Sequence, residues 1–173
     1  MNKLVHNVIW PAVAGNVLWG FLQVFADPQV VGYTLCQRLF SLLFVGVYLA
    51  VDWINTDKVT SINDDYWRYD IPLAATIATF AISTQAGAPW APIPLGFAFA
   101  VAVVGHCSGA WDESTKQSSC YARAALATIN ALGILLLLGG WFFGGAIMLW
   151  SMPVAIFLVV SLFLSLRKKI ATL

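Results

Sequence analysis

The chain has 173 residues, of which 60% are hydrophobic and only 10% are charged, and its formal net charge is +1. Soluble domains carry roughly a quarter charged residues, so this composition excludes an ordinary soluble protein. The near-neutral charge excludes a basic nucleic-acid-binding surface, and the three cysteines do not make a disulfide framework.

Two apolar stretches open the chain. Residues 8–25 contain no charged residue and are followed by Asp27-Pro28, and residues 30–51 contain one charge, Arg38. Each is close to the about 20 apolar residues that a helix needs to cross the hydrocarbon core of a membrane. No cleavage site of small residues follows the first stretch, so we expect a retained membrane helix. A polar loop is expected over residues 52–70.

Two longer stretches, residues 71–111 and 124–166, contain no Asp, Glu, Lys or Arg. As single helices they would each be about 60 Å long, twice the hydrocarbon thickness, so each must fold back. Prolines mark the first turn and glycine pairs mark the second: Pro89, Pro92 and Pro94, then Gly139-Gly140 and Gly144-Gly145. The predicted helices are 71–88, 95–111, 124–138 and 143–166. The helix at 124–138 is the shortest, and if it were re-entrant the C-terminus would change side.

The fold expected from these spans is an all-α integral membrane protein, a single domain of residues 1–173 forming a compact bundle of about six transmembrane helices. Six crossings place eight of the nine basic residues on one side: Lys3, Lys58, Arg68, Lys116, Arg123, Arg167, Lys168 and Lys169. The other side has none. Basic residues mark the cytoplasmic side, so both ends are predicted to be cytoplasmic. The expected location is a plasma membrane, in particular a bacterial inner membrane.

Several polar side chains fall inside the predicted spans and are candidates to line a solute site or pore. They are Asn16, Gln23, Arg38, Thr76, Thr79 and Ser83. Arg38 is expected about 12 Å below the outer boundary, where a charge is costly and often functional. The alternative is that its long side chain reaches the outer headgroups. For the hydroxyls, the alternative to a wet cavity is hydrogen bonding between helices.

The predicted helix 95–111 carries small residues on one face, namely Ala98, Ala102, Gly105 and Gly109. Small residues let two backbones approach closely in lipid. This face therefore predicts either a contact in a homo-oligomer or packing within the chain, and the two readings stay open.

The polar loop 52–70 offers acidic and aromatic residues that could dock a cytoplasmic protein partner: Asp64, Asp65, Tyr66 and Trp67. A solvated interfacial loop is the simpler reading. His106, Cys107 and Cys120 match no zinc-ligand spacing, so we expect neither a metal nor another cofactor. No catalytic motif is complete, so the sequence gives no support for an enzyme.

Two hypotheses of function follow. In the first, the protein is an oligomeric channel or small-solute or ion transporter, because polar residues and Arg38 lie within the spans. In the second, it is a non-conducting membrane subunit that anchors or regulates a cytoplasmic partner, for example in envelope immunity or defence. Fold class alone does not choose between them.

Overall fold

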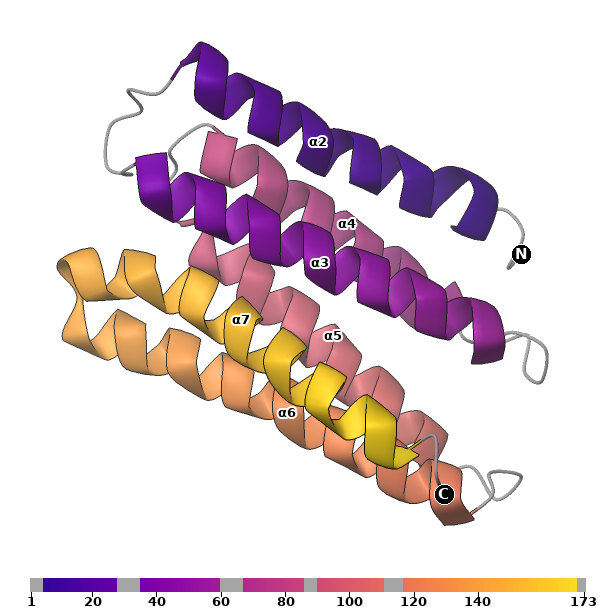
Figure 1. Cartoon of the computed structure of the whole chain (residues 1–173). Coiled ribbons are helices and arrows are strands. Elements are labelled where there is room, and N and C mark those ends of the chain that lie inside the picture. Colours follow the sequence, from indigo (N-terminus) through magenta and orange to yellow (C-terminus); the bar gives the residue numbers. More distant parts are fainter. Residues whose placement is uncertain (1–4, 28–34, 60–66, 86–89, 111–116, 171–173) are drawn as a thin grey trace.

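The computed structural model describes residues 5–27, 35–59, 67–85, 90–110 and 117–170, and at some helix ends only the backbone. The described residues form an all-α bundle of six long helices (Figure 1). These helices are α2 (Trp10–Ala26), α3 (Leu35–Val59), α4 (Trp67–Gln85), α5 (Pro92–Ala110), α6 (Gln117–Phe143) and α7 (Gly145–Ile170). A π-helical turn, η1 (Val5–Ile9), precedes α2.

The helices are arranged as two faces and two edges (Figure 1). α3 and α7 lie side by side on one face, α4 and α5 on the other, and α2 and α6 form the edges. α2 packs on both α3 and α4, and α6 packs on both α5 and α7. The start of η1 and the end of α7 lie at the same end of the bundle (Figure 1). The two ends lie together because the chain runs along the bundle six times, reversing direction at each turn.

The turns follow from proline and glycine. α2 ends where the Asp27 N–H donates to the Gln23 carbonyl at 2.8 Å, and the proline after Asp27 disfavours further helix. α4 ends at Gln85 and α5 begins at Pro92, a position where a missing N–H is tolerated. α6 and α7 are joined at Gly144, whose φ of +67° is a left-handed conformation that favours glycine.

The structure differs from the sequence prediction at several helix ends. The expected loop 52–70 is helical at both ends, because α3 continues to Val59 and α4 begins at Trp67. Likewise, α6 begins at Gln117 instead of at residue 124. Gly139 and Gly140, expected in the turn, lie inside α6. The physical reason is that polar residues end a membrane span but do not end a helix. Residues 52–59 contain no proline or glycine to stop α3.

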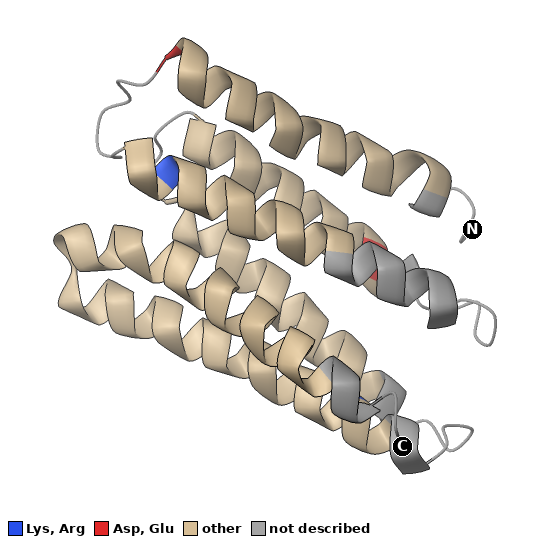
Figure 2. Cartoon of the chain, in the orientation of Figure 1, with Lys and Arg blue, Asp and Glu red and all other residues tan. Residues whose placement is uncertain are grey.

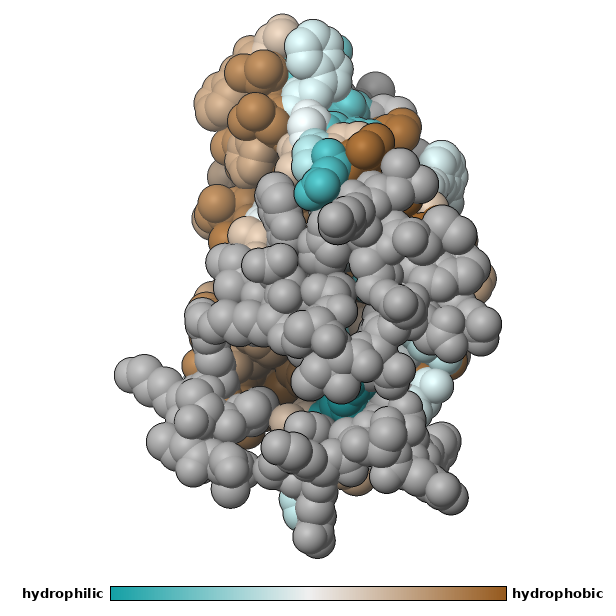
Figure 3. Space-filling view, turned by 90° about the vertical axis from the view of Figure 1, so that its right-hand side faces the viewer, coloured by the Kyte–Doolittle hydropathy of each residue, from teal (hydrophilic) through white to brown (hydrophobic). Residues whose placement is uncertain are grey.

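Within the part of the chain that the structure describes, three helical segments are long and apolar enough to span a membrane: Asn7–Ala26, Cys120–Phe143 and Gly145–Leu166. Leu35–Ala50 and Pro92–Ser108 are shorter apolar helices. In Figure 2 the middles of the helices are nearly free of charged residues, and in Figure 3 hydrophobic side chains cover one flank of the bundle. Exposed apolar side chains are frequent on the described surface, as at Phe25, Phe97 and Leu135. These features indicate a multi-pass membrane protein in contact with a lipid bilayer.

Most of the side chains buried between the two faces are apolar. Leu42 and Val45 of α3, Ile77 and Phe80 of α4, and Phe99 of α5 are all buried there. α7 contributes Met152, Ala155 and Ile156 to the same core. α7 continues through Pro153 as one helix.

Candidate functional site

Arg38 lies in the first turns of α3 and is 1% exposed. Its Nη1 donates to the Asp27 carbonyl at 2.8 Å, and its Nη2 donates to the Gln85 carbonyl at 3.4 Å. Asp27 is the C-cap of α2 and Gln85 is the last residue of α4. Terminal carbonyls lack helical donors and carry partial negative charge. The guanidinium therefore caps the C-terminal ends of two helices at once.

A pair of amides extends this contact toward α2. The Gln85 Nε2 donates to the Asn16 side-chain oxygen at 3.3 Å and to the Asn16 carbonyl at 3.4 Å. Gly20 makes room for the pair, since a Cβ at Gly20 would lie 2.8 Å from the Gln85 Nε2. We call Asn16, Asp27, Arg38, Ser41 and Gln85 the Arg38 cluster. It joins α2, α3 and α4.

Two donors in the Arg38 cluster have no hydrogen-bond partner within the described residues. They are the Arg38 Nε and the Ser41 hydroxyl, and Ser41 is fully buried one helical turn after Arg38. A buried donor without a partner costs roughly 1–3 kcal/mol. The pair could therefore receive an anionic or carbonyl oxygen, because the guanidinium supplies charge and the hydroxyl a second hydrogen bond.

The remaining candidate pore-lining residues lie apart from this cluster or meet it only through the backbone. Gln23 contributes its backbone carbonyl to the end of α2. The hydroxyls of Thr76, Thr79 and Ser83 each donate to a backbone carbonyl of their own helix. Thr79 lies on the outer surface of the bundle, whereas Ser83 is fully buried. Of the six candidates, Asn16 and Arg38 therefore belong to the Arg38 cluster through side-chain hydrogen bonds.

The small residues of α5 are used inside the chain. Ala98 and Ala102 are buried, and a Cβ at Gly105 would lie 3.1 Å from the ring of Tyr69 on α4. Gly109 lies where only the backbone is described. The described part of this face therefore packs against α4 and the core.

Most of the candidate docking residues lie outside the part of the chain that the structure describes. Asp64, Asp65 and Tyr66 lie outside the described residues, and Trp67 begins α4 without a described side chain. Asp70, which precedes the apolar part of α4, is only 8% exposed. Burial raises the pKa of its carboxyl to about 6.

Sequence reasoning missed two polar contacts. Gln85 was not singled out, although it is an amide at the end of an uncharged stretch and such amides need partners in lipid. Asn130 was also missed, and its side-chain oxygen accepts a hydrogen bond from the Tyr48 hydroxyl at 3.4 Å. This contact links α3 to α6 between the two faces. The available signal was an asparagine within an apolar helix.

Within the described ranges, no three His, Cys, Asp or Glu residues are placed to hold a metal ion. The described cysteines, Cys36, Cys107 and Cys120, are not joined in a disulfide. No protein-family model, curated protein or solved structure matches this chain.

Proposed function

We propose that the protein crosses the bilayer six times with both ends in the cytoplasm, and that it transports a small anionic or carbonyl-bearing solute. Support for the crossings comes from the six long helices and the eight-to-none distribution of basic residues. The Arg38 cluster is the proposed binding site, in the outer half of the membrane.

The observation that carries this proposal is the buried charge of Arg38 with two unpartnered donors, its own Nε and the Ser41 hydroxyl one turn further along α3. Asp27 is the acidic residue that interacts electrostatically with it, and Asp27 is itself exposed at the end of α2. In a low-dielectric surround, a fixed positive charge attracts an anion far more strongly than in water. A solute oxygen would satisfy the Arg38 Nε and the Ser41 hydroxyl together.

Solute flux into proteoliposomes tests the site, with chloride, nitrate, acetate and neutral amino acids as probes. Ser41→Ala is the most informative variant, because the hydroxyl has no described hydrogen-bond partner to lose. We expect it to lower flux several-fold without lowering thermal stability. Ser165→Ala is the control, since Ser165 is exposed and bonds only to the Ser161 carbonyl. Equal flux through wild type and Ser41→Ala would contradict the site.

A second function is favoured by the capping geometry. Both Nη groups of Arg38 already bond to helix ends. A purely structural Arg38 fits a non-conducting membrane subunit that binds a cytoplasmic partner through the segment containing Asp64, Asp65, Tyr66 and Trp67. Absence of wild-type flux for every probe, with recovery of a stoichiometric soluble partner from detergent extracts, would favour this function.

The topology has its own test. In a cysteine-free background, Trp90→Cys and Ala146→Cys should react with an impermeant thiol reagent from outside intact cells, because both positions are exposed near predicted outer turns. Asn63→Cys and Ser118→Cys should react only after permeabilisation. Labelling of Asn63→Cys from outside would overturn the proposed orientation.

The proposed transporter would act as a homo-oligomer, because six helices of this length enclose little space. The outward face of α4 is a candidate contact for a second copy. Ala75 and Thr79 are exposed there, and the Thr79 hydroxyl is satisfied by the Ala75 carbonyl. Small exposed residues allow close helix approach in lipid. Ala75→Leu should reduce the oligomer size in native mass spectrometry.

A further inference from the structure

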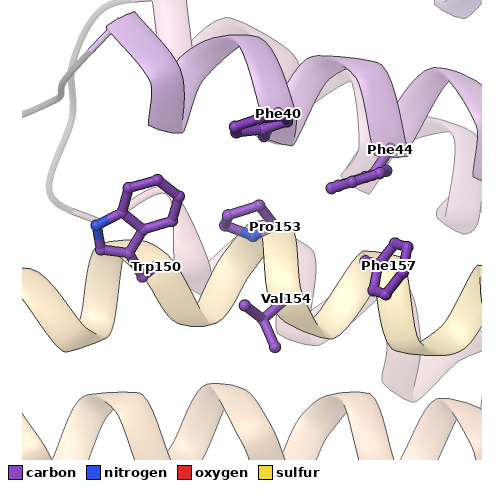
Figure 4. Close-up of a pocket in the computed structure, with 6 residues that line it drawn as sticks. All are labelled: Phe40, Phe44, Trp150, Pro153, Val154 and Phe157. Carbon is purple, nitrogen blue, oxygen red and sulfur yellow. The ribbon is translucent and has the colours of Figure 1, made fainter.

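A groove lies on the surface of the helix bundle, between α3 and α7 (Figure 4). Phe40 and Phe44 of α3 face the α7 side chains across it. Its volume is about 230 Å³ and its exposed lining is wholly apolar. The lining residues are Phe40, Phe44, Trp150, Pro153, Val154 and Phe157.

The walls of the groove are built from packed rings. Phe40 stacks on Phe44 with ring centroids 6.0 Å apart, and Phe44 contacts Phe157 at 5.2 Å. Pro153 is buried at the base, whereas Val154 and Phe157 are about half exposed. The Phe40–Phe44 contact lies within α3, and the Phe44–Phe157 contact joins α3 to α7.

The groove lies in the deep, acyl-chain part of the bilayer. Helices rise about 1.5 Å per residue, so Trp150 and Phe157 lie about 8 Å and 18 Å from the start of α7. Counted from residue 30, the predicted outer boundary of the α3 span, Phe40 and Phe44 lie about 15 Å and 21 Å deep. Half of a hydrocarbon core is about 15 Å thick. The groove therefore extends from the acyl chains of the leaflet next to the α6–α7 turn to about the middle of the bilayer.

We propose that this groove binds one acyl chain of a phospholipid from the outer leaflet. The proposal rests on the membrane orientation given above but not on transport. The groove opens onto the exposed apolar surface, because four of its lining residues are themselves exposed: Phe40, Trp150, Val154 and Phe157. No charged residue lines it to receive a headgroup. One turn of a helix, about 5.4 Å long and 10–12 Å across with its side chains, fills roughly 500 Å³ and exceeds the groove, whereas an acyl chain is much narrower than a helix. An empty groove would lose dispersion contacts.

Native mass spectrometry of protein extracted in mild detergent tests the site. Val154→Trp should fill the groove and remove one retained phospholipid per chain relative to wild type. Val104→Trp is the matched control, because Val104 is a similarly exposed valine on α5, away from the groove (57% against 49% for Val154). Equal phospholipid retention by the two variants, or none by wild type, would overturn the site.

Fluorescence gives a second readout in bilayers. Phosphatidylcholine with brominated acyl chains should quench Trp150 at a lower mole fraction than Trp19, an exposed tryptophan of α2 outside the groove. The contributions of Trp150 and Trp19 to the fluorescence are identified by repeating the measurement on the Trp150→Phe and Trp19→Phe variants. Equal quenching would also contradict a preferential site. Failure of the protein to float with liposomes would instead contradict the membrane placement itself, so the two failures are distinguishable.

Discussion

The first three long helices and the last three are held together by different kinds of contact. α2, α3 and α4 meet in the Arg38 cluster, where a buried cation and two amides bond across three helices. α5, α6 and α7 instead meet at glycines. A Cβ at Gly133 would lie 2.9 Å from Phe99 and 3.0 Å from Val159, and one at Gly140 would lie 2.5 Å from the Ser151 side chain.

This difference shows two solutions to one problem. Lipid is as apolar as leucine, so burying leucine against leucine gives helices little reason to associate in a membrane. Polar contacts provide one reason, because an unsatisfied donor in hydrocarbon is costly. Close backbone approach at glycines provides the other, through dispersion. We therefore expect the first half to be sensitive to loss of polar groups and the second to added volume.

The largest effect is expected for Arg38→Gln. It removes two charge-assisted hydrogen bonds and leaves the terminal carbonyls of α2 and α4 without their donor, so unfolding should become easier by about 3 kcal/mol. Thermal unfolding in detergent measures it. Arg38→Lys is the control, because it keeps the charge but loses the planar fork of donors, so it should cost less. Unchanged stability of Arg38→Gln would remove the distinction between the halves.

Gly140→Ala comes next. The added methyl group would overlap the Ser151 Cβ, and the Met148 Cα of the backbone would lie 3.3 Å away, so we expect a loss of about 2 kcal/mol. Gly139→Ala is a control one residue away, where no atom lies within 4 Å. It should be neutral or stabilising by about 0.5–1 kcal/mol, because alanine favours helix. Equal effects would show that α6 and α7 are not closely packed there.

Asp70 should make stability depend on pH. Its pKa is raised by burial from 3.8 to about 6, so the folded state binds the proton more tightly than the unfolded state. Stability should therefore be highest below about pH 4, and it should fall as the pH rises toward 6 and above. From pH 5 to pH 7 the expected loss is about 1 kcal/mol. Asp70→Asn should remove this part of the dependence, and an unchanged pH profile would contradict it.

The smallest effect compares two glycines of α2. Gly15→Ala should stabilise by about 0.5–1 kcal/mol, since no atom lies within 4 Å of its Cβ. Gly20→Ala should lose this gain, because its Cβ would displace the Gln85 amide and contact Leu42. Both neighbours are flexible side-chain ends, so the cost is expected to stay below about 1 kcal/mol. Matching gains at both sites would mean that Gln85 does not pack on Gly20.

The sequence by itself determined that the chain is an all-α bundle of six long helices with an apolar surface. Charge-free stretches too long for one crossing, interrupted by Pro89 to Pro94 and by Gly144-Gly145, already require two hairpins. Helix lengths were predicted less well, because hydropathy indicates where a membrane span ends, and a helix can continue beyond that point. The continuation of α3 to Val59 and the early start of α6 depend on the absence of helix-breaking residues.

Only the tertiary structure decided what Arg38 contacts and which faces are buried. From the sequence, Arg38 was expected to contact either a solute or a lipid headgroup. Its described partners are instead the carbonyls of Asp27 and Gln85, 11 and 47 residues away. Likewise, Gly105 packs on Tyr69 within the chain. Such partners depend on how α2, α4 and α5 are placed around each other. A single-helix pattern carries no information about that placement, because many arrangements would bury the same residues.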